Sequence, residues 1–268
     1  MNNFKFIFFI LGVVGLVTFT SCDEDDAAAL VQSFNIDLKA AYTIPTNTGS
    51  ETGTITMDLF DDNTLQYTIT VNGMDASDVL TKAHVHLGDV VTSGSSAITF
   101  FSDEISGNTI SDVLTLTAED VATLTGEDVY VNVHSQMSPS GLVRGQIDKT
   151  IDYAYNVALS PDNEVPAVTD RMETGNGYFR IINSTMYFKV QISDLNIMDT
   201  ITKAHFHAGV AGKNGPVYVD LELTGDQLDT TKMLELTAEQ LNQVINDPTY
   251  VNVHSSDHPS GLLRGQIR

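Results

Sequence analysis

The chain has 268 residues and a formal net charge of −22 at pH 7, and 42% of its residues are hydrophobic. That hydrophobic share can build packed cores, so the chain is not disordered as a whole, and its length suits two domains of ordinary size. The strong negative charge, with no basic stripe to offset it, excludes nucleic acid as a partner because the phosphate backbone would be repelled.

The N-terminus predicts export. Residues 1–21 have the form of a lipoprotein signal peptide: Lys5 supplies the positive charge, and residues 6–19 are an apolar run too short to span a bilayer comfortably. The run ends at Cys22, the only cysteine of the chain. This ending resembles a bacterial lipobox, in which the thiol of Cys22 carries the lipid and becomes the mature N-terminus. We therefore expect the membrane to be a partner through a lipid anchor, the alternative being an ordinary signal peptide with an incidental cysteine.

Residues 22–29 are predicted to be an acidic tether, with Asp-Glu-Asp-Asp at 23–26 directly after the cysteine. In lipoproteins of the Bacteroidetes type, which this segment resembles, such a cluster directs the protein to the outer face of the outer membrane. We expect an outer-membrane protein exposed at the cell surface, with the periplasmic leaflet as the alternative. A single cysteine allows no disulfide within the chain, so the domains depend on their cores.

An internal repeat divides the rest of the chain into two copies, residues 30–149 and residues 151–268. The segment TKAHVHLG that begins at Thr81 returns as TKAHFHAG at Thr202. Each copy ends with YVNVHS, then PSG and RGQI. A period near 120 residues indicates tandem domains rather than a solenoid.

Each copy is predicted to be rich in strands. Phe34–Leu38 alternates apolar and polar residues, and so do Thr54–Leu59 and Leu65–Val71. The turn residues Asp-Asp-Asn at 61–63 predict that the last two strands form a hairpin.

The predicted helical signal is one short segment per copy. Thr117 with Asp120, and Thr237 with Gln240, have the spacing of a capping box ahead of an apolar stretch. The Pro-Ser-Gly of each copy predicts a hairpin turn between the VNVH strand and the RGQI strand. The expected fold class is all-β: two tandem antiparallel Greek-key sandwich or barrel domains, with one short helix each.

In both copies an HxHxG strand, an LTxE turn, a YVNVH strand and a PxGxxRGQI strand follow one another. This combination resembles the CHRD domain over nearly all of the mature chain. The resemblance implies an immunoglobulin-like or superoxide-dismutase-like β fold and no general enzymatic activity. The first copy departs after His86, because residues 88–91 do not match the loop at 209–217, and a role for that loop is not carried over to it.

Strand alternation places the polar motif residues of each copy on one face. Val85 faces away from His84 and His86, and we expect the valines of these strands to point into the core. The polar face then gathers the following side chains, copy by copy: His84, His86, Asn132, His134, Arg144 and Gln146, and His205, His207, Asn252, His254, Arg264 and Gln266.

Two interpretations of this face remain open. In the first, the three histidines of each copy bind copper or zinc, since two histidines at i and i+2 on a strand and a third on a neighbouring strand can reach one ion. The HxH strand also resembles the copper-ligand strand of Cu/Zn superoxide dismutases, but three histidines per copy are too few for a copper–zinc pair. In the second, favoured interpretation the same groups form a polar network. His258 is read as a loop residue, because Ser138 takes its place in the first copy.

Catalytic patterns fail on inspection, since the chain lacks a Gly-x-Ser-x-Gly elbow and a Gly-rich loop between a strand and a helix. No residue is therefore assigned as catalytic. The leading expectation is a non-enzymatic binding or adhesion module whose ligand is an unknown extracellular protein or glycan. The alternative is a metal-binding or redox-related protein that uses copper or zinc.

Overall fold

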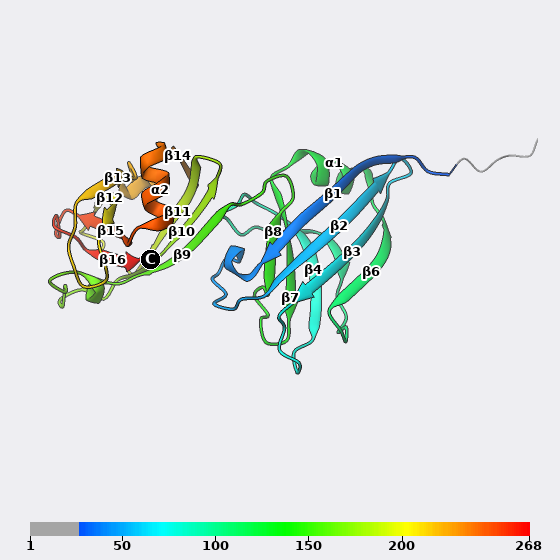
Figure 1. Ribbon diagram of the computed structural model, residues 1–268, viewed down its shortest axis with the longest axis horizontal. Coiled ribbons are helices and arrows are strands. Elements are labelled where there is room, and N and C mark those ends of the chain that lie inside the picture. The colour runs from blue at the N-terminus through cyan, green and yellow to red at the C-terminus, as the bar shows by residue number, and fades with distance from the viewer. Residues whose placement is uncertain (1–26) are drawn as a thin grey trace, which may run out of the picture.

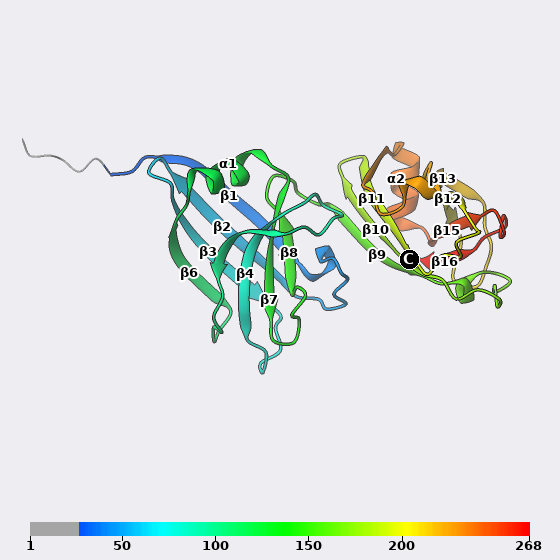
Figure 2. The ribbon, with the colours of Figure 1, turned by 180° about the vertical axis from the view of Figure 1, so that it is seen from behind.

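The computed structural model describes residues 27–268 (Figures 1 and 2). The predicted signal peptide, Cys22 and the acidic run at 23–26 lie outside the described residues. The described part forms sixteen strands and two α-helices in two tandem domains, β1–β8 (domain 1) and β9–β16 (domain 2), which follow one another along the long axis of the molecule. The predicted all-β, antiparallel fold class is confirmed. Within residues 27–268, no helix combines the length and apolarity that crossing a membrane requires.

Domain 1 is one antiparallel sheet with the strand order β5-β4-β7-β8-β1-β2-β3-β6, curled so that its two halves enclose the core. β1 meets β8 at a single position, where Lys39 pairs with Arg144. The elements of domain 1 are β1 (Leu30–Lys39), the 3-10 turn η1 (Ala40–Tyr42), β2 (Thr52–Phe60), β3 (Thr64–Asn72), β4 (Leu80–Leu87), β5 (Ser96–Phe101), β6 (Thr109–Thr115), α1 (Ala118–Gly126), β7 (Val129–Ser135) and β8 (Val143–Gln146).

Domain 2 repeats this arrangement as two four-stranded sheets, β14-β11-β10-β9 and β13-β12-β15-β16. An isolated bridge between Ser160 and Arg264 stands where β1 and β8 pair in domain 1. The elements of domain 2 are β9 (Tyr153–Leu159), η2 (Pro161–Asn163), β10 (Thr174–Ile182), β11 (Thr185–Ser193), β12 (Ile201–Ala208), β13 (Val217–Asp220), η3 (Gly225–Gln227), β14 (Lys232–Glu235), α2 (Ala238–Asn246), β15 (Thr249–Ser255) and β16 (Leu263–Gln266).

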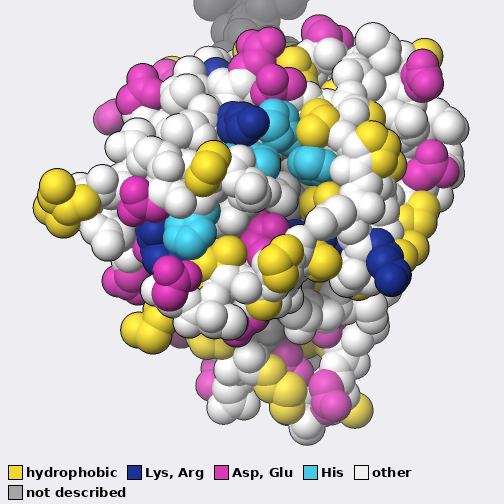
Figure 3. Space-filling model, turned by 90° about the vertical axis from the view of Figure 1, so that its left-hand side faces the viewer, with side chains coloured by type: hydrophobic (Ala, Val, Ile, Leu, Met, Phe, Trp, Pro, Cys, Tyr) yellow, Lys and Arg dark blue, Asp and Glu magenta, His cyan; other side chains and the backbone are white. Residues whose placement is uncertain are grey.

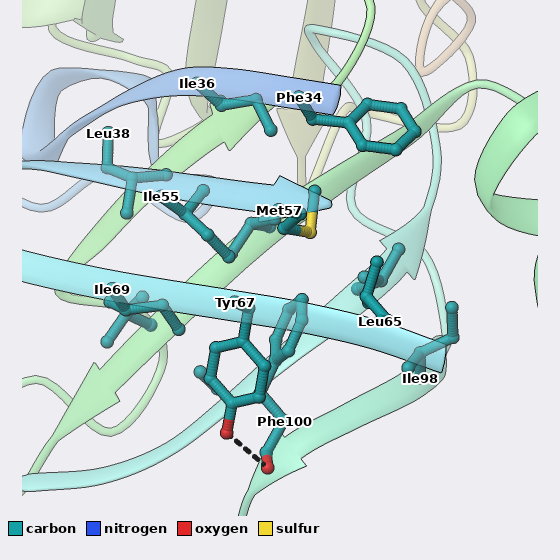
Figure 4. Packing of buried hydrophobic residues seen from close by; sticks show 14 of the residues in the cluster. Phe34, Ile36, Leu38, Ile55, Met57, Leu65, Tyr67, Ile69, Ile98 and Phe100 are labelled. Atoms are coloured by element: carbon teal, nitrogen blue, oxygen red, sulfur yellow. Dashed lines mark hydrogen bonds between the residues drawn. The ribbon is translucent and has the colours of Figure 1, made fainter. Parts of the chain in front are cut away.

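The core of domain 1 follows the predicted alternation (Figure 4). On β2, Ile55, Met57 and Leu59 are at most 1% exposed, while the residues between them face solvent. Each such side chain contributes roughly 1.5–3 kcal/mol on burial, and a slip of one residue would expose the whole row. The alternation therefore fixes the strand register. The predicted hairpin is present as β2 and β3, and Asn63 in its turn has a φ of 64°.

Two further local predictions are confirmed, and one of them positions the site. Thr117 and Thr237 cap α1 and α2 through complete capping boxes. β7 pairs with β8, and β15 with β16, across the Pro-Ser-Gly turns. Because β7 also pairs with β4, and β15 with β12, the HxH strand and the VNVH strand lie side by side in each domain.

Candidate metal centres

The pairing of β4 with β7 brings three histidines of domain 1 together. His84 lies opposite Asn132, and His134 lies opposite Lys82, so the side chains of His84, His86 and His134 project from the same face of adjacent strands. One ring nitrogen from each of the three lies within 4.8 Å of the others. The ring centroids are 5.5 to 6.2 Å apart. Three imidazoles thus converge on one point.

Backbone carbonyls fix the orientation of two of these rings. The Nδ1 atoms of His86 and His134 lie 3.0 Å from the carbonyl oxygens of Gly94 and Pro139. A carbonyl only accepts, so Nδ1 carries the proton in each ring and Nε2 keeps its lone pair. A metal-binding histidine is commonly held in this way, by a hydrogen bond from the nitrogen that does not bind the ion.

The three nitrogens that face one another are buried and unpaired. Nδ1 of His84, Nε2 of His86 and Nε2 of His134 have no hydrogen-bond partner within residues 27–268. Leaving a buried polar atom unpaired is costly, on the order of 1–3 kcal/mol for each group. An ion shared by the three nitrogens would satisfy all of them at once.

Burial also keeps these imidazoles neutral. Desolvation lowers the pKa of His84 and His86, and it lowers the pKa of His134 to about 4. The charge of Lys82 lowers each pKa further. Neutral imidazole is the form that binds a metal ion, so the site needs to release no proton near pH 7.

Domain 2 contains the same arrangement in His205, His207 and His254, again within 4.8 Å. Nδ1 of His207 donates to the Gly215 carbonyl at 3.0 Å, and Nδ1 of His254 donates to the Pro259 carbonyl at 3.1 Å. Burial lowers the pKa of all three, that of His254 to about 4. Histidine side chains gather on the surface at the end of the molecule formed by domain 2, beside a basic side chain (Figure 3).

The distance between two of these nitrogens fits a shared ion. Nδ1 of His205 lies 3.2 Å from Nε2 of His254. Two nitrogen ligands of a tetrahedral ion, each bonded at about 2.05 Å, are about 3.3 Å apart. Because the Pro259 carbonyl holds the proton of His254 on Nδ1, the Nε2 lone pair of His254 points toward His205 and accepts a hydrogen bond from its Nδ1. An ion shared by the two rings would take the place of this hydrogen bond.

The predicted polar-network residues lie beside the histidines and mainly hold the surrounding loops. Arg144 donates to the carbonyls of Asp89 and Thr92, and Gln146 donates to the carbonyl of Gly88. Asn132 donates to the Ser140 carbonyl at 3.3 Å. The face is covered rather than open, since Asn132, Arg144 and Gln146 are at most 6% exposed.

The counterparts in domain 2 act in the same way. Arg264 donates to the carbonyls of Val210 and Lys213 and to Oδ1 of Asn214. Gln266 donates to the Gly209 carbonyl. Asn252 differs, because it donates to the buried carboxylate of Glu164.

The loop after the HxH strand has the same role in both domains, which corrects the sequence-based reading of the first copy. Gly94 and Gly215 each accept from the second histidine of the HxH pair. Each glycine also donates its N–H to a tyrosine hydroxyl at 3.2 Å, that of Tyr130 or Tyr250. The two loops differ in sequence, but the carbonyls of Gly94 and Gly215 accept the same hydrogen bond. A backbone carbonyl can keep this role when the side chains of the loop change.

Tyr130 and Tyr250 also belong to the site, although their role was not predicted from the sequence. Tyr130 stacks on His86 at 5.1 Å between ring centroids, and the guanidinium of Arg144 covers its other face at 3.4 Å. Tyr250 is sandwiched in the same way between His207 and Arg264. Strand alternation could have predicted that Tyr130 lies at the site, because it places Tyr130 on the same strand face as Asn132 and His134.

His258 lies outside this group, in the turn after β15, as predicted for a loop residue. Its backbone N–H donates to the hydroxyl of Ser255, as that of Ser138 does to Ser135. The site of each domain is therefore a set of three imidazole nitrogens. Imidazole donors suit copper and zinc, and three protein ligands leave a fourth position for water or an external ligand.

Comparison with known protein families supports the tandem reading. The family model of the CHRD domain matches the chain twice, at residues 34–147 and 155–267. Searches of curated proteins and of solved structures found no match.

Proposed function

The chain belongs to the CHRD domain family, and from that premise we propose that it is a metal-binding protein whose two CHRD domains each hold one copper or zinc ion between three imidazoles. CHRD domains usually serve as binding modules without enzymatic activity. The proposal specifies what is bound. One observation carries it: three buried imidazole nitrogens converge within 4.8 Å in each domain, and carbonyls direct the lone pairs of two of the three rings inward.

A structural polar network explains less of the geometry. Such a network satisfies its buried polar groups internally. In domain 1 the guanidinium of Arg144 does so by donating to two loop carbonyls, whereas Nε2 of His86 and Nε2 of His134 are without a partner in the described part of the chain. We therefore interpret the histidines as metal ligands. Arg144 and Gln146 hold the loop beside them through its carbonyls.

Metal analysis of the full chain, purified in detergent without a histidine tag, tests this proposal. After exposure to Cu²⁺ or Zn²⁺ and dialysis, we expect two ions per chain by mass spectrometry. His84→Ala with His134→Ala reduces the content to one, and adding His205→Ala with His254→Ala reduces it to none. His258→Ala is the matched control, since it removes an imidazole outside both sites and leaves two ions. A content unchanged by the four substitutions would overturn the proposal.

The location of these sites is part of the proposal. Residues 1–21 and Cys22 support export and lipid anchoring, and the acidic run at 23–26 supports placement on the outer face of the outer membrane. In that position both domains, with the metal sites proposed in them, face the outside of the cell.

Adhesion to an extracellular protein or glycan is the second candidate function, and a specific feature of domain 2 favours it. Met172, Ile197 and Met198 are 84–95% exposed on two neighbouring loops. Arg171 joins these loops, because it pairs with Glu173 and with Asp199 at 2.6 and 2.7 Å. Replacing the three apolar side chains with serine should abolish adhesion to a surface coated with the extracellular protein or glycan, without changing the metal content of the chain.

A further inference from the structure

The loop that supports the site of domain 1 is also the loop that contacts domain 2. Val90 and Val91 are 1% and 0% exposed, packed in a cluster with Tyr42, Ile151 and Tyr178. The corresponding loop of domain 2 faces solvent, and its Val210 is 52% exposed. The two sites are thus built alike but supported differently.

Several hydrogen bonds reinforce this contact. Thr231 of domain 2 donates to the carboxylate of Asp89 at 2.6 Å. Asn156 donates to the Ala41 carbonyl at 3.1 Å, and the fully buried guanidinium of Arg180 reaches the Tyr42 carbonyl at 3.4 Å. The domains are therefore joined by specific contacts as well as by the linker.

The contacted loop reaches the histidines within a few residues. Asp89, whose carboxylate accepts from Thr231, also accepts from Arg144 through its backbone carbonyl. Five residues further along, the carbonyl of Gly94 fixes His86. Moving the loop would move the group that orients this histidine, and the loss of such a supporting group typically weakens metal binding 10- to 100-fold.

We propose that docking of domain 2 on the loop at residues 88–94 regulates the metal affinity of the site in domain 1, while the site in domain 2 acts independently. This inference rests on the proposed metal-binding function. Thermodynamic linkage makes the effect reciprocal, so an ion bound at His84, His86 and His134 strengthens the docking of the two domains. Metal affinity in domain 1 therefore depends on docking of the two domains, whereas metal affinity in domain 2 does not.

The test uses the full chain in two parent variants that each retain one site. His205→Ala with His254→Ala leaves the site of domain 1, and His84→Ala with His134→Ala leaves the site of domain 2. Into each parent we introduce Tyr178→Ala, which removes an apolar contact with Val90 and Val91 from the domain 2 side. Competition titration of Cu²⁺ or Zn²⁺ against a chromophoric chelator should give an affinity about ten-fold weaker in the first parent and unchanged in the second.

A second variant and a metal-free measurement separate the possible failures. Thr231→Val is nearly isosteric and removes only the bond to Asp89, so it guards against misfolding of the tyrosine variant. Amide exchange of residues 88–94 in the metal-free protein should accelerate in both variants, while residues 209–215 stay unchanged. Parents that bind no metal would refute the proposed function itself. If the parents bind metal but neither substitution changes the affinity at domain 1, the coupling between docking and metal affinity is overturned and the proposed function stands.

Discussion

In domain 2, Nε2 of His205 lies 3.9 Å from a carboxylate oxygen of Asp220 on the neighbouring strand. In the structure Nδ1 of His205 donates to Nε2 of His254, 3.2 Å away. An ion bound between these two nitrogens requires the proton of His205 to sit on Nε2 instead, and the negative charge of Asp220 favours that tautomer. In domain 1 the residue paired with His84 is Thr99, which carries no charge. The first histidine of the HxH pair therefore lies beside a carboxylate in domain 2 and beside a neutral threonine in domain 1.

Asp220→Asn is expected to weaken copper or zinc binding at domain 2 by at most about five-fold, because the exposed carboxylate favours the Nε2–H tautomer of His205 through its charge alone. The measurement is a competition titration in the variant that lacks His84 and His134. Thr99→Asp is the reciprocal change, and it should strengthen binding at domain 1 when the site of domain 2 has been removed. Orientation by Asp220 is refuted if both sites respond equally or neither responds.

Arg264→Lys should destabilise domain 2 by roughly 1–3 kcal/mol. Lysine keeps the charge but cannot serve the carbonyls of Val210 and Lys213 while stacking 3.5 Å above the ring of Tyr250. Urea unfolding monitored by tyrosine fluorescence measures the loss. Arg144→Lys is the matched change in domain 1 and should cost a similar amount. A loss below about 0.5 kcal/mol would mean that the planar guanidinium is not required.

Much of the candidate site could be predicted because it depends on alternation within single strands. Val85 is fully buried between His84 and His86, as the period of two requires. The repeat then assigned the same face to both copies. The pairing of β4 with β7 joins segments about fifty residues apart, and only the shared motif content suggested that they are neighbours.

The remaining features lie in backbone groups and in contacts between distant segments. The carbonyls of Gly94 and Pro139 orient two histidines. Because every residue has a backbone carbonyl, the residue type does not show which carbonyls take this role. The docking of Val90 and Val91 on domain 2 depends on how the two domains sit, which no local pattern encodes. The three histidines of each copy could therefore be predicted from the sequence, but the backbone groups that orient them could not.

Cys22→Ala tests the predicted lipid anchor. Without the thiol no lipid can be attached, so we expect the protein to leave the membrane fraction or to accumulate as an unprocessed precursor. Fractionation with metabolic labelling by a fatty acid measures both. Ser21→Ala is the control, because it keeps a small residue before the cysteine. Unchanged membrane partitioning of Cys22→Ala would refute lipid anchoring.

Neutralising the acidic run, with asparagine or glutamine at positions 23–26, tests the predicted surface exposure separately. We expect protease added to intact cells to remove the domains of the original protein and to leave those of the variant intact. Both proteins should fractionate with the outer membrane, since Cys22 is unchanged. Equal protection of the original protein and the variant would instead support the periplasmic leaflet.

Glu164 gives domain 2 a pH dependence that domain 1 lacks. Glu164 is 7% exposed, and its carboxylate accepts a hydrogen bond from Asn252 at 3.2 Å. Burial raises the pKa of Glu164 to about 7, although the charge of Arg264 opposes the rise. Thr43 takes the corresponding position in domain 1, two residues before the cis proline, and has no charge to lose.

The raised pKa fixes the sign of the effect. The folded protein holds this proton more tightly than the unfolded chain, in which a glutamate titrates near 4.3. The stability from the neutral carboxyl is therefore complete below about pH 4 and is lost as the pH rises through about 7. Glu164→Gln is neutral throughout, so relative to it the original protein should lose at most about 3 kcal/mol between pH 4.5 and 8. Urea unfolding at pH 4.5, 6 and 8 measures this difference. Because Thr43→Val should shift stability equally at all three values, a difference that stays constant for Glu164→Gln as well would show that this carboxyl is not the titrating group.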